Sequence, residues 1–167
     1  KIASNDLKVT GNTFLNNGKV DATSADFNLQ NDFTTKGTVS TDKLTLKSNN
    51  AVNDGKILSG SANISVKEKV INNDTVNIGK FYVNAKSLEN KKDIRANNLN
   101  ITTNENTVNT GTITANNVTI NAGSVVNTNK IETESLNIKT RGNTENSGQI
   151  LSNNLTVNRD NFINKNE

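Results

Sequence analysis

The 167-residue sequence contains no cysteine, histidine, proline, tryptophan or methionine. Without cysteine the chain forms neither a disulfide framework nor a thiolate metal site. Without histidine it lacks the commonest general base and the commonest metal ligand. Aromatic residues make up only 4% of the chain, so no basic-aromatic array for nucleic acid is present. We therefore expect no enzyme, no cofactor, no metal site and no nucleic-acid partner.

Charge and apolar runs are also sparse. The net charge is only +3, and no stretch approaches the 18 consecutive apolar residues of a membrane-spanning helix, so we expect no membrane insertion. The hydrophobic content of 31% leans by itself toward disorder. The apolar residues, however, fall into regular columns. Because the sequence starts in mid-pattern without a methionine, we expect one repeat domain over residues 1–167, cut from a longer chain.

A β-branched aliphatic residue recurs along the whole chain at steps of 18 and 19 residues in strict alternation. A fixed period in this range is typical of one supersecondary unit stacked on itself, a solenoid. The nine residues, which we define as position zero of nine coils, are Ile2, Val20, Val39, Ile57, Val76, Ile94, Ile113, Ile131 and Ile150.

Positions +5 and +7 of every coil are apolar too, and the residue between them is polar in most coils. This period of two indicates a strand with one buried face. Position +5 holds Leu7, Ala25, Leu44, Ala62, Phe81, Leu99, Val118, Leu136 and Leu155. Position +7 holds Val9, Phe27, Leu46, Ile64, Val83, Ile101, Ile120, Ile138 and Val157. Position +2 is small in every coil except that of Ile78, which favours a tight inward corner.

Asparagine closes each coil, with Thr35 as the one departure. The asparagines are Asn16, Asn53, Asn72, Asn90, Asn109, Asn127, Asn146 and Asn164. Two residues later the chain has glycine in five coils and Asp74, Lys92, Asn129 or Asn166 in the others. Glycine, Asn and Asp tolerate positive φ, so this position predicts a turn with a left-handed residue. The spacing from position +7 to the asparagine alternates between 7 and 8, so the extra residue always falls in the same arc.

These columns predict an all-β fold, a right-handed parallel β-helix of about nine coils whose length alternates between 18 and 19 residues. A left-handed hexapeptide helix is disfavoured, because the spacings of +5 and +7 do not place an apolar residue at every sixth position. Stacked at the ~4.8 Å strand spacing, each coil pairs with the next in parallel. We expect the asparagine side chains to point inward and to hydrogen-bond along the axis as a ladder.

The pattern Ile-x-Ala-x-x-Leu-x-Ile, followed by Asn-x-Gly, resembles the haemagglutinin repeats of filamentous haemagglutinin-like exoproteins. Residues 94–111 carry it most fully, with Ile94-Arg-Ala-Asn-Asn-Leu-Asn-Ile101 and then Asn109-Thr-Gly111. The resemblance implies a structural shaft segment of a secreted, fibrous adhesin or haemagglutinin, or of a contact-dependent inhibition toxin, at the surface of a Gram-negative bacterium. It also implies an outer-membrane secretion partner and a receptor or glycan on a host or neighbouring cell.

The alternative is a carbohydrate-binding or carbohydrate-active β-helix module. Glu132 and Glu134 are the only close pair of acids, and the constant coil length leaves no long loop to wall a catalytic cleft. Tyr82 lies between inward residues of its strand, so it is expected to be exposed as a weak candidate for glycan contact. Finally, uncapped end coils lead us to expect that this fragment self-associates end to end.

Overall fold

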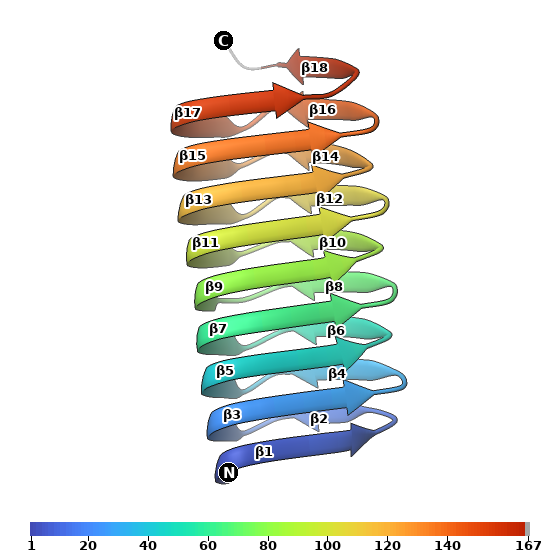
Figure 1. Ribbon diagram of the computed structural model, residues 1–167, viewed down its shortest axis with the longest axis vertical. Coiled ribbons are helices and arrows are strands. Elements are labelled where there is room, and N and C mark those ends of the chain that lie inside the picture. Colours follow the sequence, from blue (N-terminus) through green and yellow to red (C-terminus); the bar gives the residue numbers. More distant parts are fainter. Residues whose placement is uncertain (166–167) are drawn as a thin grey trace.

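The computed structural model describes residues 1–165, which form strands and turns and no helix. The chain winds upward as one continuous solenoid (Figure 1). Each coil runs from left to right along a front strand, returns behind in a short strand and rises by one level. That sense is right-handed, the usual hand for connections between parallel strands. The predicted right-handed parallel β-helix of about nine coils is therefore confirmed.

Each coil contributes one long and one short strand. The long strands are β1 (Ile2–Gly11), β3 (Lys19–Leu29), β5 (Thr38–Ser48), β7 (Lys56–Val66), β9 (Val76–Ala85), β11 (Asp93–Thr103), β13 (Thr112–Ala122), β15 (Lys130–Thr140) and β17 (Gln149–Asn158). The short strands are β2 (Phe14–Asn16), β4 (Asp32–Thr35), β6 (Asn50–Asn53), β8 (Lys69–Asn72), β10 (Ser87–Asn90), β12 (Asn106–Asn109), β14 (Ser124–Asn127), β16 (Asn143–Asn146) and β18 (Asn161–Asn164).

The long strands form one parallel nine-stranded sheet, the long sheet, and the short strands form a second one, the short sheet. Neighbours in each sheet are successive coils. Position zero pairs with position zero, as in Ile94 with Ile113 and Ile113 with Ile131. The ladder skips position +3 in every long strand, for example at Asn116, where each strand turns its corner. The corner reverses which residues point inward, so positions zero and +2 are inward before it and +5, +7 and +9 after it.

The core is a stack of these inward columns. Position zero is at most 8% exposed from Val20 to Ile131, and the large side chains at +5 and +7 are equally covered. Two coils have alanine at position +5. Beside one of them, three phenylalanine rings, Phe14, Phe27 and Phe33, pack together with ring centroids 4.7 to 5.8 Å apart. Large rings thus fill volume that the small residues leave open.

The residue that makes alternate coils longer lies in the turn from the long sheet to the short sheet. Two residues, Gln30 and Asn31, join β3 to β4, whereas Asn49 alone joins β5 to β6. The same turns project alternately farther and less far along one side of the shaft (Figure 1). The alternation therefore leaves the core columns in register, as expected from the spacing.

The predicted left-handed turn residue is wrong. No described residue has positive φ, whether glycine or not. Glycine is needed at this position for a different reason: a Cβ at Gly37, Gly111 or Gly148 would overlap a main-chain carbonyl of the preceding coil. Lys92, Asn129 and Asp74 occupy the same position in other coils, also without positive φ. The equivalent Asn166 lies outside the described residues.

Candidate functional site

The asparagine column lies inside the shaft, where the short sheet ends. Seven of its eight members, Asn16 through Asn146, are at most 6% exposed, whereas Asn164 in the last coil is exposed. From Asn53 onward the Nδ2 group of each side chain donates to Oδ1 of the next, at 2.7 to 2.8 Å, in one unbroken direction as far as Asn164. The buried amides therefore form a chain of aligned hydrogen bonds parallel to the axis.

The same side chains also hold the following turn. Asn109 Nδ2 donates a second hydrogen bond, at 3.1 Å, to the carbonyl of Lys130 in the next coil. Asn16 Oδ1 accepts from the main-chain N–H of Gly18 at 3.1 Å. Among the described residues no buried side-chain nitrogen or oxygen lacks a partner. The column is thus a structural element that closes each coil and joins it to its neighbours.

Thr35 interrupts this chain without leaving a polar group unpaired. Its hydroxyl accepts from Asn16 Nδ2 at 3.0 Å and donates to the carbonyl of Gly37 at 3.4 Å. A threonine can therefore replace one asparagine when its hydroxyl donates to a main-chain carbonyl of the following turn. It does not extend the chain of amides to Asn53.

Tyr82 lies on the outer face of the long sheet and is 48% exposed. Its neighbours in register are Asn63 in the coil below and Asn100 in the coil above. The outward positions on either side of it in its own strand hold Lys80 and Asn84, so the ring lies among polar side chains. A single aromatic ring flanked by amides is a minimal platform for a sugar.

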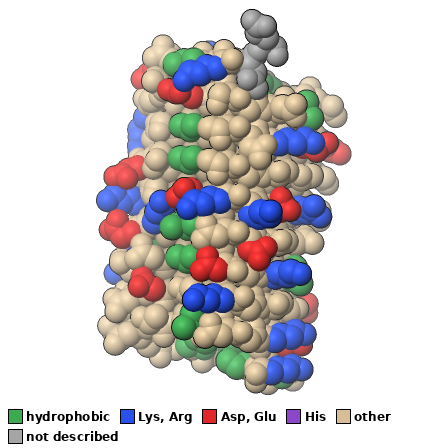
Figure 2. Space-filling model, turned by 180° about the vertical axis from the view of Figure 1, so that it is seen from behind, with side chains coloured by type: hydrophobic (Ala, Val, Ile, Leu, Met, Phe, Trp, Pro, Cys, Tyr) green, Lys and Arg blue, Asp and Glu red, His purple; other side chains and the backbone are tan. Residues whose placement is uncertain are grey.

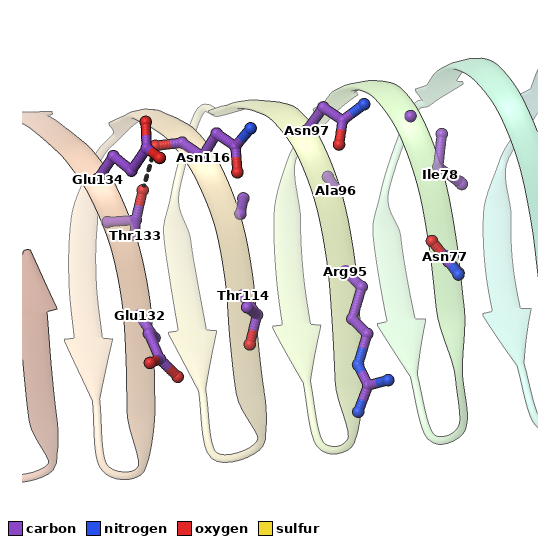
Figure 3. Close-up of a pocket in the computed structure, with 12 residues that line it drawn as sticks. Asn77, Ile78, Arg95, Ala96, Asn97, Thr114, Asn116, Glu132, Thr133 and Glu134 are labelled. Carbon is purple, nitrogen blue, oxygen red and sulfur yellow. Dashed lines mark hydrogen bonds between the residues drawn. The ribbon is translucent and has the colours of Figure 1, made fainter.

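A polar groove runs along the corner of the long sheet and is a second candidate surface. We call it the corner groove; it is formed by positions +1 to +3, with Ile78, Ala96 and Ala115 along its floor. From the fifth to the eighth coil it forms an open hollow of about 530 Å³, lined by Asn77, Ile78, Gly79, Arg95, Ala96, Asn97, Thr114, Ala115, Asn116, Glu132, Thr133 and Glu134 (Figure 3). A similar hollow of about 560 Å³ lies at the same corner in the first three coils. Tyr82 lines neither hollow.

Glu132 lies just before the strand corner and Glu134 lies at the corner itself. Figure 3 shows their carboxylates pointing apart, with Thr133 between them. Glu132 pairs with Lys130 at 2.7 Å, and the Thr133 hydroxyl donates to the carbonyl of Asn116 at 2.8 Å. The groove therefore offers amides, hydroxyls and paired charges to a ligand, but not two carboxylates aimed at one point. No three acidic side chains within residues 1–165 gather as a metal site.

Three successive turns from the long sheet to the short sheet carry side chains of alternating charge. Lys86, in a shorter turn, lies between Glu68, at 3.3 Å, and Glu105, at 3.6 Å, which are both in turns that contain the extra residue. The hydrogen bond that Lys86 donates to Glu68 and the charge of Glu105 raise the pKa of Lys86 above its ordinary value. Farther along, the Arg141 guanidinium reaches past the shorter turn at Gly123 and donates to the carbonyl of Asn104, two coils away. These turns therefore carry solvent-exposed ion pairs and hydrogen bonds that join neighbouring coils.

Two sets of residues were not found from the sequence. Position +9 continues the inward period of two and is buried in seven coils, but it mixes Ser48, Thr103 and Thr140 with aliphatic residues, which hides the pattern. The outer face of the short sheet carries aliphatic residues as well. They occupy the position directly before each asparagine, which points outward and so belongs to no buried column.

Comparison with known proteins finds no matching family model, no matching curated protein and no matching solved structure. Within the described residues there is also no helix with the length and apolarity needed to cross a bilayer. The fold itself, a parallel β-solenoid of uniform coils, is compatible with a structural, shaft-like repeat module.

Proposed function

We propose that the chain is a length of shaft in a secreted or cell-surface fibrous exoprotein, of the adhesin, haemagglutinin or toxin-delivery kind. The observation that carries the proposal is the uniform cross-section. Coil length changes by one residue at one turn only, so the outline never opens into a cleft walled by long loops. A solenoid of this kind gains length by adding coils without changing its core.

The internal bonding suits a rod that holds a distant tip in place. Every step along the axis is joined by the ladder of the long sheet, the ladder of the short sheet and, from Asn53 onward, the chain of buried amides. The chain contains no cysteine, so its folding is independent of the redox state outside the cell. The resemblance of residues 94–111 to haemagglutinin repeats supports the same assignment, with export by an outer-membrane partner.

Immunogold electron microscopy of intact source cells tests this proposal. Antibodies raised against residues 1–165 should label material that projects from the surface of unpermeabilised cells, and the label should be lost when the outer-membrane secretion partner is deleted. Labelling that requires permeabilisation of the cells would overturn the proposal.

A second candidate function is a carbohydrate-binding module. The corner groove favours it, because Asn97 and Asn116 occupy the same position of two successive coils and so repeat at the spacing of the coils, as hydroxyl groups repeat along a linear glycan. A glycan array separates the two functions. Binding that is lost in Tyr82→Ala and kept in Tyr82→Phe would favour the module and place the ligand on the outer face. Binding lost in Asn97→Ala would place the ligand in the corner groove. If no glycan binds, the shaft remains the only proposed function.

A further inference from the structure

The outer face of the short sheet carries an aliphatic stripe that the fold does not cover. The stripe is formed by the residue before each asparagine, and four of its six aliphatic members are half-buried by their neighbours in the sheet while the first and last are exposed. Figure 2 looks onto this face, where hydrophobic side chains form a column that charged side chains interrupt. In chain order the nine positions hold Leu15, Thr34, Val52, Ile71, Glu89, Val108, Val126, Glu145 and Ile163.

Strand propensity alone does not account for the stripe. The outward positions +4, +6 and +8 of the long sheet are also in strands, and Tyr82 is the only apolar residue among them. The β-branched residues at these positions are threonines, such as the half-buried Thr45 and Thr119. Apart from Tyr82 and, at outward position +1, Leu58 and Leu151, the outer face of the long sheet has no large apolar side chain, whereas the short sheet presents an aliphatic side chain to water in six of its nine coils.

The stripe has an ordered pattern. A polar residue occupies every third coil, at Thr34, Glu89 and Glu145, with two aliphatic residues between successive polar ones. Read from either end, the order of apolar and polar positions is the same, with Glu89 at the centre. A second copy turned end for end about that centre therefore meets apolar with apolar and polar with polar at every level.

The charged groups fit the same arrangement. Glu89 is held between Lys69, at 2.6 Å, and Lys91, at 3.4 Å, so its charge is already neutralised where it meets its own copy. Glu145, which pairs with Lys165 at 2.9 Å, comes opposite Thr34 of the other copy. The exposed Lys36 follows that threonine by two residues and supplies a cation beside the carboxylate.

We propose that two copies of this chain associate side by side and antiparallel, through the outer faces of their short sheets. The occupant of the stripe is thus a second shaft. Nine levels at ~4.8 Å and four residues at ~3.3 Å give a face of roughly 550 Å² per copy. Two such faces reach the lower limit of specific interfaces, so the isolated chain pairs weakly and more coils pair more strongly. This association is independent of how the protein is exported.

Sedimentation equilibrium of the 167-residue chain tests the surface. The variant Val108→Lys/Val126→Lys puts two cations on the stripe, and it should lower the association constant at least tenfold. The control Asn100→Lys/Thr119→Lys puts the same charges on the outer face of the long sheet in the same two coils, and it should change the constant by less than twofold. Circular dichroism establishes that both variants stay folded. Equal effects of the two variants would overturn the proposal.

Cross-linking tests the orientation and separates it from end-to-end stacking. The chain has no cysteine, so introduced thiols are the only ones present. Facing sheets lie ~10 Å apart, a span suited to a bismaleimide of that length. Chains carrying Val52→Cys mixed with chains carrying Val126→Cys should give a linked dimer, whereas Val52→Cys alone should not. A link in Val52→Cys alone means parallel pairing, and no link in the mixture means no pairing through this face; either result contradicts the proposal.

Discussion

Asn109→Ala tests the buried ladder at its best-ordered point. Asn109 is 2% exposed, accepts from Asn90 Nδ2 at 2.7 Å, and donates to Asn127 Oδ1 at 2.7 Å and to the Lys130 carbonyl at 3.1 Å. Alanine removes all three hydrogen bonds. Asn90 keeps other acceptors, since its Nδ2 group also donates to the Lys92 carbonyl at 2.9 Å. Asn127 Oδ1 loses the donor that the ladder gave it.

The loss is therefore dominated by the buried Asn127 Oδ1 and the partly buried Lys130 carbonyl, which both lose the donor that Asn109 supplied. Leaving such a group unpaired costs about 1–3 kcal/mol, and we expect Asn109→Ala to lower the free energy of unfolding by about 2 kcal/mol. For a chain of this length that is a decrease of roughly 4–8 °C in Tm. Differential scanning calorimetry or thermal denaturation followed by circular dichroism measures it.

Two comparison variants make the result specific. Asn97→Ala in the same coil removes an exposed asparagine of the corner groove, and its Tm should stay within about 1 °C of the parent, as for most surface changes. Asn109→Thr copies the natural Thr35 and keeps an acceptor for Asn90, so it should cost less than alanine. If Asn109→Ala and Asn97→Ala unfold at the same temperature, the ladder does not stabilise the fold.

Four further outcomes follow from the packing and the charges. Thr103 and Thr107 hydrogen-bond at 2.9 Å in the core, so either Thr→Val change alone should cost about 1–3 kcal/mol while the double change is nearly neutral, a double-mutant cycle that equal additive losses would contradict. Ala51→Val adds two methyl groups beside an apolar cavity of about 40 Å³ and should raise the unfolding free energy by about 1 kcal/mol in urea titrations. A hydrogen bond from Lys69 holds the pKa of Glu89 below its ordinary value of 4.5, so its contribution is present above pH 4.5 and is lost as the pH falls through the lowered pKa; Glu89→Gln should flatten stability over that acid range. The isolated chain, whose first and last coils expose aliphatic side chains, should also stack end to end in sedimentation, and a strict monomer at high concentration would refute this.

The sequence predicts the repeat, the hand, the inward columns and the arc of the extra residue, because each of these rests on side chains that recur at one spacing. Because the coils stack, every coil needs the same kind of side chain at position zero and at the asparagine position. A preference that is weak in one coil is therefore clear when it recurs in nearly all of them. The burial of Asn109 and the exposure of Tyr82 follow from their place in that period.

Other features depend on how neighbouring coils approach one another, so the sequence of one coil does not predict them. Gly37 and Gly111 looked like left-handed residues, yet what they provide is room for the carbonyl of the coil below. The aliphatic stripe that contains Val108 and Val126 was not predicted from the sequence, because a four-residue strand has too few outward positions to show a pattern by itself. Its order becomes visible only when the coils are stacked and the face is followed along the axis.

Small-angle X-ray scattering of a lengthened chain tests the shaft most directly. Duplicating residues 94–130 inserts one complete 37-residue double coil and keeps the alternation of 18 and 19. The maximum dimension should increase by about 10 Å, two strand spacings, with the cross-sectional radius unchanged. Duplicating residues 113–130 alone places two shorter coils in succession and should give a less stable protein. An unchanged length or a wider cross-section for the 37-residue insertion would contradict the account.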